Sequence, residues 1–410
     1  MASALTYAYT GRDASGKTVK GRVDAPSETS VVARLRTMGI APVSIQQVAA
    51  GAGLNRDISL GGLFDKKITL KDLAVMSRQM ATMISAGLPL LKALTILAGQ
   101  SENPKLAETL DEVRSAVEEG STFSDSLAKH PKAFPPIFVN LVRAGEVGGF
   151  LETSLESVAK NFEKEVELKA TIKSALTYPV VVLIMAVLAV VGMIVFIVPV
   201  FDDLFSDLGG TLPLPTQILV VISENMVWIG PVAIVLGIAG SIWWRANRHT
   251  PKFRSIYEPL LLKMPVFGDL FKKIAIARFT RNFGMMIGAG VPILQALSII
   301  GSTSGNWQVE QAVNSVQDSV RQGRSIAGPL ANEPIFPPMV TQMIAVGEDS
   351  GALETMLEKI ADFYDAEVQT TTESLTSLIE PLMIAFLGVV LGGMIVALYL
   401  PIFDIFNQVQ

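Results

Sequence analysis

The sequence contains the same long pattern twice, and this duplication constrains the fold more than any other feature. The run "RAGEVGGFLETSLESVAKNFEKEVE" beginning at residue 143 returns as "AVGEDSGALETMLEKIADFYDAEVQ" at residue 345, an offset of 202. Upstream, "SRQMATMISAGLPLLKAL" at residue 77 returns as "TRNFGMMIGAGVPILQAL" at residue 280, an offset of 203. A duplication of this length predicts two similar structural units within one chain.

Each copy has the hydrophobic pattern of a helical bundle. Apolar residues recur at spacings of three and four, as in Leu151, Leu155 and Val158, and glycines end the periodic runs. The last helix of each copy contains no glycine or proline until an apolar run begins. We therefore expect two small antiparallel bundles, each with a last helix that continues into a membrane and has room for a kink at Pro179 or Pro381.

Three apolar stretches are suited to spanning a membrane. Residues 179–200 and 381–403 contain no charged side chain, and 22 helical residues reach about 33 Å, enough for a hydrocarbon core of roughly 30 Å. Residues 226–244 are shorter but end in the Trp pair that is typical of a membrane interface. Only 17% of the residues are charged, and the mean hydropathy is +0.44. We expect three transmembrane helices.

The distribution of basic residues predicts the orientation. Residues 202–225 contain four acidic side chains and no Lys or Arg, whereas basic residues precede the first span and follow the second. The positive-inside rule then places the acidic loop and the C-terminus outside and the N-terminus in the cytoplasm. The first 18 residues show neither the basic start nor the apolar run of a secretory signal. We expect a multi-pass protein of the bacterial cytoplasmic (inner) membrane.

The composition argues against several functional classes. The chain has no cysteine and two histidines, so thiolate and histidine metal sites are not expected, and we predict no cofactor. The net charge of −5 gives no electrostatic basis for binding nucleic acid. The spans contain no ionisable residue of the kind that marks a transport pathway. We predict no catalytic residues.

One short motif suggests a nucleotide site. Residues 11–18, "GRDASGKT", fit the phosphate-loop pattern G-x-x-x-x-G-K-[ST]. A phosphate loop follows a buried strand and opens a helix, but here alternating segments lie on both sides of the motif and Pro26 follows soon after. This context favours a β-hairpin with Lys17 in its turn over a nucleotide site.

The predicted fold class is mostly α and integral to the membrane, with two repeated cytoplasmic helical bundles, each leading into a transmembrane helix, and a small N-terminal α/β module. The expected segments are the N-terminal module (1–48), a linker (49–68), the first bundle (69–175), the first transmembrane helix (176–201), an external acidic loop (202–220), the second transmembrane helix (221–244), a cytoplasmic basic connector (245–271), the second bundle (272–377), the third transmembrane helix (378–403) and an external tail (404–410).

Candidate functional residues lie at matching positions of the repeats. The acidic residues at the helix junctions suit capping and the dipole of the next helix, with partner contact or a cation site as alternatives. The two arginines suit ion pairs within their own bundles more than partner contacts, and two glycines of the third span suit close helix packing, within the chain or between copies. The junction or partner-contact candidates are Arg78, Glu146, Gly148, Glu152, Arg281, Glu348, Gly351 and Glu354, and the helix-packing candidates are Gly388 and Gly392.

These duplicated motifs, the three spans and the opening "GK…G…GIAPVSI" pattern resemble the inner-membrane platform proteins of type IV pilus and type II secretion machines, the PilC/GspF family. The resemblance covers residues 5 to 406. It implies a non-enzymatic platform that couples a hexameric assembly ATPase to pilin or pseudopilin subunits, with a retraction ATPase as a further candidate partner. It also implies contacts with other inner-membrane assembly components and membrane lipid, and we expect a homo-oligomer.

Three functions remain open from the sequence. Pilus assembly is the favoured one, and a type II secretion platform is the main alternative, since no residue distinguishes the two systems. A weaker alternative is a membrane-bound nucleotide-dependent transporter that uses Lys17 and Thr18.

Overall fold

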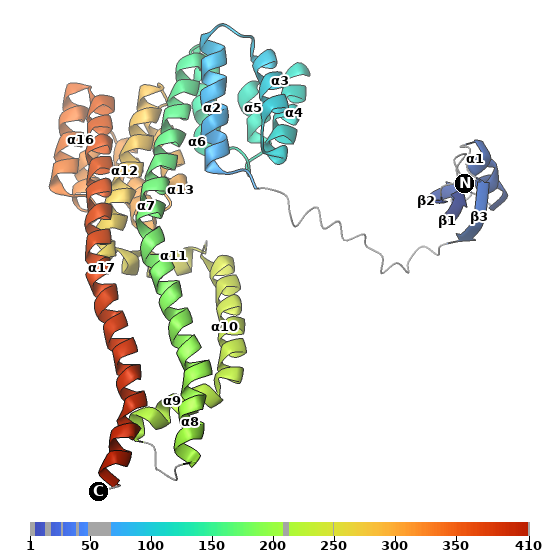
Figure 1. Ribbon diagram of the computed structural model, residues 1–410. Coiled ribbons are helices and arrows are strands. Elements are labelled where there is room, and N and C mark those ends of the chain that lie inside the picture. Colours follow the sequence, from blue (N-terminus) through green and yellow to red (C-terminus); the bar gives the residue numbers. More distant parts are fainter. Residues whose placement is uncertain are drawn as a thin grey trace. The chain divides into compact units, whose positions relative to one another are not determined.

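The structure is a computed structural model that describes residues 5–12, 18–25, 28–37, 41–47, 67–207, 213–248 and 250–408. The chain divides into two compact units, residues 1–65 and residues 66–410 (Figure 1).

The N-terminal unit contains a three-stranded antiparallel sheet and one described helix. Strand β1 (Leu5–Arg12) lies between β2 (Thr18–Ala25) and β3 (Ala41–Gln47), and α1 (Glu28–Thr37) connects β2 to β3. The alternation of β1 puts Tyr7 and Tyr9 on one face, where they are buried, and α1 contributes buried Val31 and Leu35. This small apolar layer holds the helix against the sheet.

The strands give the local context of the phosphate-loop pattern. In β1 and β2, Leu5 pairs with Ala25 and Arg12 with Thr18, which is the arrangement that a hairpin requires. The pattern's last residue, Thr18, begins a strand, whereas a phosphate loop opens a helix. The turn itself, with Lys17, lies outside the described residues.

The larger unit is helical throughout its described part, and one succession of helices occurs twice (Figure 1). The first succession is α2 (Leu70–Ser85), α3 (Leu90–Gln100), α4 (Pro104–Glu118), α5 (Phe123–Ala128), α6 (Pro136–Gly148) and α7 (Leu151–Gly192). The second is α12 (Phe267–Gly288), α13 (Ile293–Thr303), α14 (Trp307–Arg321), α15 (Ala327–Ala331), α16 (Pro338–Ser350) and α17 (Leu353–Gln408). We call α2–α6 with residues 151–175 of α7 bundle 1, and α12–α16 with residues 353–377 of α17 bundle 2.

Local signals in the sequence set the helix ends. Asn103 caps α4 by accepting hydrogen bonds from the backbone N–H groups of residues 105 and 106, and Asn306 caps α14 in the same way. At the other end, Gly149 after α6 and Gly351 after α16 adopt the left-handed conformation, with φ of 76° and 69°. Glycine favours this conformation because it has no Cβ, so each chain can reverse into its long last helix.

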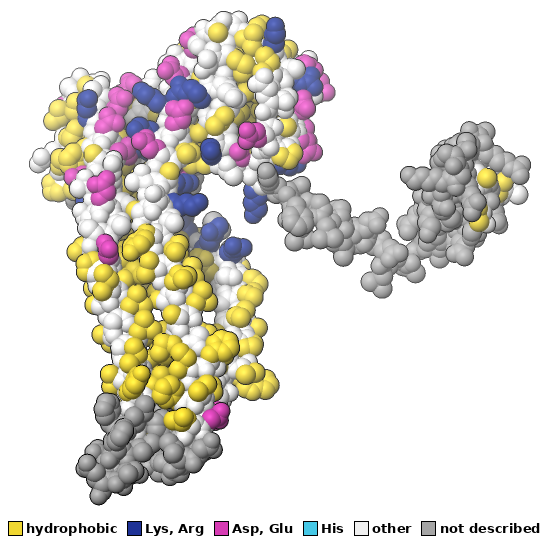
Figure 2. Space-filling model, viewed as in Figure 1, with side chains coloured by type: hydrophobic (Ala, Val, Ile, Leu, Met, Phe, Trp, Pro, Cys, Tyr) yellow, Lys and Arg dark blue, Asp and Glu magenta, His cyan; other side chains and the backbone are white. Residues whose placement is uncertain are grey.

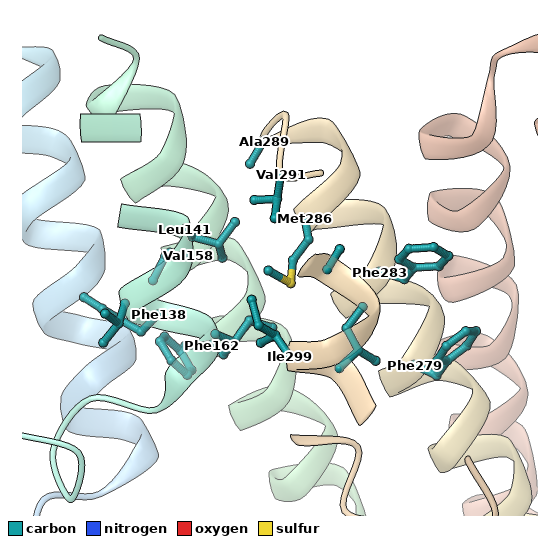
Figure 3. Close-up of a cluster of buried hydrophobic side chains, with 14 of the residues drawn as sticks. Phe138, Leu141, Val158, Phe162, Phe279, Phe283, Met286, Ala289, Val291 and Ile299 are labelled. Carbon is teal, nitrogen blue, oxygen red and sulfur yellow. The ribbon is translucent and has the colours of Figure 1, made fainter. Parts of the chain in front are cut away.

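The two bundles share one hydrophobic core. Figure 3 shows Phe138, Leu141 and Phe162 of bundle 1 in the same cluster as Phe283 and Met286 of bundle 2. All five side chains are at most 4% exposed. Residues that are far apart in the sequence therefore stabilise one another, and the bundles form a single packed body.

Three helical segments of the described chain are long and apolar enough to cross a membrane: Leu151–Leu204, Met226–Asn247 and Leu353–Pro401. The first consists of α7, the π-helix η2 (Met193–Ile197) and the start of α8 (Val198–Asp207); the second is α10 (Met226–Asn247). Figure 2 shows a band of hydrophobic side chains over this part, with the charged side chains gathered over the bundles. As expected, α7 and α17 run without interruption from bundle to span, through Pro179 and Pro381.

The structure differs from the predicted segments at four places. The segment expected as a loop at 202–220 is partly helical, because α8 extends to Asp207 and α9 (Leu214–Glu224) follows. A break at Asn225 separates α9 from α10, so the second apolar helix begins later than residue 221. The connector 245–271 contains α11 (Pro251–Leu262) and the start of α12, and the tail expected from residue 404 continues α17.

Packing explains why α9 is a separate helix. Its Val220 packs with Val198 of α8 and Leu398 of α17, and the side-chain hydroxyl of Thr216 donates to the backbone carbonyl of Ala397. The hydroxyl of Ser223 donates to the carbonyl of Ile194 in the π-helix, at 2.6 Å. These contacts fasten α9 to both long helices, which hydropathy alone does not predict.

Candidate functional site: the repeat-related junctions

Two glutamates at matching positions hold the short helices of the bundles. Glu146 of α6 accepts hydrogen bonds from the backbone N–H groups of Phe123 (2.7 Å) and Ser124 (3.0 Å) and from the Ser124 hydroxyl (2.6 Å). Glu348 of α16 accepts two from the N–H of Ile326, both at 2.9 Å. Each carboxylate therefore caps the helix that precedes its own, α5 or α15.

This arrangement corrects one detail of the sequence interpretation. Capping was expected at the helix that follows each glutamate, but the capped helix is the preceding short one, because the chain folds back between them. Glu152 and Glu354 do lie in the first turns of α7 and α17, where a negative charge complements the helix dipole.

The glycines at the two junctions either adopt a left-handed backbone conformation or allow close contact with a neighbouring side chain or helix. Gly149, and not the predicted Gly148, is the structural counterpart of Gly351. Gly148 is the last residue of α6 and lies against the ring of Phe150. A Cβ on Gly148 would come within 1.9 Å of that ring. Gly145 permits close contact between α6 and the start of α7, since a Cβ there would lie 2.4 Å from the Ser154 hydroxyl oxygen. Its counterpart Gly347 likewise lies against the first turn of α17; the repeat alone could have indicated this pair, which sequence reasoning missed.

Each matched arginine is paired with an acid on the long helix of its own bundle. Arg78 of α2 makes two hydrogen bonds to Glu163 of α7, with Nε–Oε1 at 2.7 Å and Nη2–Oε2 at 2.6 Å. Arg281 of α12 forms an ion pair with Asp365 of α17. The side-chain hydrogen bond to Glu163 is the main reason that the pKa of Arg78 is raised. Glu163 and Asp365 are 202 residues apart, the offset of the repeat, and both are acidic. This match was not part of the prediction from the sequence.

These pairs connect the bundles to the membrane segment. In each bundle the first helix, α2 or α12, packs along the long helix, α7 or α17, and the ion pair lies on that contact. The two long helices also contact each other, and Leu168 and Val368 join Leu270 of α12 in a small core. The ion pairs therefore join the first helix of each bundle to its long helix, and the small core joins the two long helices to each other.

A hydroxyl-lined groove lies between α7 and α17 below that small core. It has a volume of about 730 Å³, and its walls carry Thr171 and Ser174 on one side and Thr372 and Thr376 on the other. Glu380 also lines the groove, directly before the apolar run that begins at residue 381. These hydroxyl and carboxylate side chains lie at the level where the two long helices become apolar.

The two glycines of the third span make no close contact with other residues in the described part of the chain. A Cβ on either Gly388 or Gly392 would meet no atom within 4 Å. Among the described residues, no close packing partner therefore lies against these glycines, and packing between copies stays a prediction. In the described ranges of the chain, no group of three or more His, Asp or Glu side chains is arranged to hold a metal ion.

Sequence comparisons with known proteins give matches over nearly the whole chain. The family model of type II secretion system protein F matches residues 76–199 and 279–401, and the model of its N-terminal domain matches residues 1–46. A type IV pilus assembly protein PilC from Myxococcus xanthus is 42% identical, covering 98% of this chain and 96% of the relative. PilC from Thermus thermophilus is also 42% identical (98% and 99% covered), and type II secretion system protein F from Vibrio cholerae is 31% identical (98% of each).

Proposed function

We propose, from the premise that this chain belongs to the family of type II secretion system protein F and the type IV pilus assembly proteins PilC, that it is the platform of a pilus assembly machine. As a member of that family with three apolar helices, it is an inner-membrane protein. In the proposed role it is not an enzyme: it couples a cytoplasmic hexameric ATPase to the extraction and polymerisation of pilin. The identities favour the pilus, because they run from 33% to 42% for the pilus relatives and from 31% to 33% for the secretion relatives.

The observation that carries the proposal is the continuity of α7 and α17. Each is one helix from a packed bundle to an apolar span, and each is tied to the first helix of its bundle by an ion pair. The helical backbone is unbroken through Pro179 in α7 and through Pro381 in α17, so in the proposed role force applied to a bundle is passed along one helix to its span. A scaffold of this kind needs a motor outside itself.

The proposed orientation places the bundles in the cytoplasm, with the C-terminus external. The exposed basic side chains of α7 and of the α10–α11 connection support it, because positively charged residues accumulate on the cytoplasmic side. A homo-oligomer around the growing filament is part of the proposal. The groove between α7 and α17 is the place where we expect a pilin helix to approach.

We further propose that the N-terminal unit is a separate α/β module that docks on another assembly component. Its buried Tyr7, Tyr9, Val31 and Leu35 supply a core of its own. Expression of residues 1–48 alone, followed by circular dichroism and thermal melting, tests whether it folds; an unfolded fragment would contradict the proposal.

The decisive experiment is capture of the genomically adjacent hexameric ATPase by the detergent-solubilised chain. Truncations lacking residues 1–66 or 67–175 run beside it, and nucleotide binding is measured on the full chain and on Lys17→Ala. We expect ATPase capture and no nucleotide binding. Nucleotide binding that is lost in Lys17→Ala, with no ATPase captured, would support the transporter instead. A deletion strain that loses secretion but keeps its pili would support the type II secretion alternative.

A further inference from the structure

Helix α11 exposes an apolar stripe in a region that is not one of the three spans. Ile256 is 72% exposed and Leu260 is 65% exposed. Residues four positions apart lie on the same face of a helix, so the two side chains form one stripe. A stripe of large apolar side chains on a short helix next to a span requires a partner that is itself apolar.

The opposite face of α11 is fixed against bundle 2 by a polar network. Glu258, 6% exposed, accepts a hydrogen bond from Arg254 (2.9 Å) and one from the backbone N–H of Trp307 at the start of α14. Arg254 also donates to Glu310 (2.8 Å). Burial lowers the pKa of Arg254, but the two glutamates outweigh this and the net effect is a raised pKa. Residues two positions apart lie about 200° apart around a helix. The stripe therefore faces away from bundle 2.

Aromatic contacts fasten α11 to the end of α10. The rings of Trp243 and Trp244 lie 5.4 and 5.1 Å from that of Phe253, and Trp244 lies 5.2 Å from Tyr257, all centroid to centroid. Trp and Tyr are enriched where a membrane meets water, because their rings are apolar with a polar edge. This cluster marks the end of the α10 span as the level of a membrane surface, and α11 begins at that level.

Cationic side chains surround the stripe. Arg245 at the end of α10 and Lys252 and Lys263 at the two ends of α11 are exposed, and none of them forms an ion pair with a residue that the structure describes. Figure 2 shows Lys and Arg side chains along the edge of the hydrophobic band nearest the bundles. Anionic headgroups attract such cations, and an amphipathic helix with apolar and basic residues lies in the plane of the membrane.

We propose that α11 is a membrane-surface helix whose Ile256 and Leu260 enter the leaflet nearest the bundles, while Arg245, Lys252 and Lys263 bind anionic phospholipid headgroups. The Arg254–Glu258–Glu310 network then sets the height of bundle 2 above that leaflet. The inference requires only that α10 spans a membrane, so it stands or falls independently of the ATPase and of pilin. The proposed partner of the apolar stripe is a lipid surface. The labelling experiment distinguishes it from a second copy of the chain or another protein.

The absence of cysteine allows the stripe to be tested directly by single-site spin labelling. Leu260→Cys is labelled in the full chain in lipid nanodiscs, with Val389→Cys of the third span (75% exposed) and exposed Ser315→Cys of α14 as lipid and water references. We expect the label at position 260 to be relaxed by oxygen, as at 389, and little by a water-soluble nickel complex. Behaviour like position 315 overturns the proposal. Shielding from both agents overturns it too, in favour of a protein partner.

The lipid preference is tested with the double variant Arg245→Gln and Lys252→Gln. Retention of phosphatidylglycerol over phosphatidylcholine is measured by native mass spectrometry of the full chain from mixed nanodiscs. Each cation near an anionic surface contributes about a fivefold factor, so the double variant should lose roughly 25-fold in preference. The matched control, Lys129→Gln with Lys132→Gln, removes two exposed charges from bundle 1 and should keep the preference. Equal preference in all three proteins overturns the headgroup site.

Discussion

Bundle 1 and bundle 2 share a pattern but differ in how far their matching contacts are buried. The Arg78–Glu163 side chains of bundle 1 are 39% and 43% exposed, whereas Arg281 and Asp365 of bundle 2 are 13% and 22% exposed. In bundle 2, α12 also contacts α11 and α7 in addition to its own long helix. Duplication therefore copied the contacts inside a bundle, and the surroundings of each copy then made those contacts unequal.

The Asn161–Asn282 contact between the bundles has no second copy in the described part of the chain. Asn161 of α7 donates a hydrogen bond to Asn282 of α12 at 3.0 Å, and both side chains are 8% exposed. The equivalent positions are Phe363 on α17, 46% exposed, and Gln79 on α2, also exposed. At these positions, one repeat therefore buries its side chain between the bundles, and the other repeat exposes the matching side chain on the surface.

The largest expected effect tests whether the shared core makes the bundles one cooperative body. Phe138→Ala removes a fully buried ring that lies 5.2 Å from Phe134 and 6.0 Å from Phe162, and should cost about 3–5 kcal/mol. Hydrogen exchange of the detergent-solubilised chain should then speed up in α12 as well as in α2–α7. Phe363→Ala, at an exposed position, serves as the control. Faster exchange confined to bundle 1 would show that the bundles unfold separately.

A smaller effect is expected where the bundles meet. Asn161→Ala leaves the buried carbonyl oxygen of Asn282 without its donor, which costs about 1–3 kcal/mol, while Gln79→Ala at the matching exposed position should change stability by less than about 0.5 kcal/mol. The double variant Asn161→Leu with Asn282→Leu should recover most of the loss, because neither polar group is then unpaired. Urea unfolding measures all three. A double variant no better than the single one would show that the asparagines do more than satisfy each other.

The sequence predicted the parts of this fold that depend on local pattern. The uninterrupted helices from Leu151 and Leu353 follow from the absence of glycine and proline before the apolar runs, and the duplicated motifs placed the two bundles. The sequence did not predict the break at Asn225, because apolar residues continue on both sides of it. It also did not predict helix α11, because residues 245–271 were interpreted as a basic connector.

The candidate site was less predictable because its geometry comes from tertiary contacts. Glu146 was correctly placed at a helix junction, but which helix it caps depends on how α5 folds back onto α6. The acids that pair with Arg78 and Arg281 lie more than 80 residues away in sequence. Only the repeat could have indicated them, since Glu163 and Asp365 are both acidic at corresponding positions.

The smallest expected effect measures the inequality of the two ion pairs directly. Arg281→Ala should cost about 1–2 kcal/mol, because Asp365 is left largely shielded from water, and Arg78→Ala less than about 1 kcal/mol, because Glu163 stays well solvated. The salt dependence should differ in the same direction, since counter-ions screen the exposed pair more effectively. The exchanged variants Arg78→Glu with Glu163→Arg and Arg281→Asp with Asp365→Arg keep each pair while reversing it. The reversal should be tolerated in bundle 1 and less so in bundle 2, where the surroundings are packed around one orientation. Equal losses in the two bundles, at low and high salt, would mean that the burial of bundle 2 does not strengthen its ion pair.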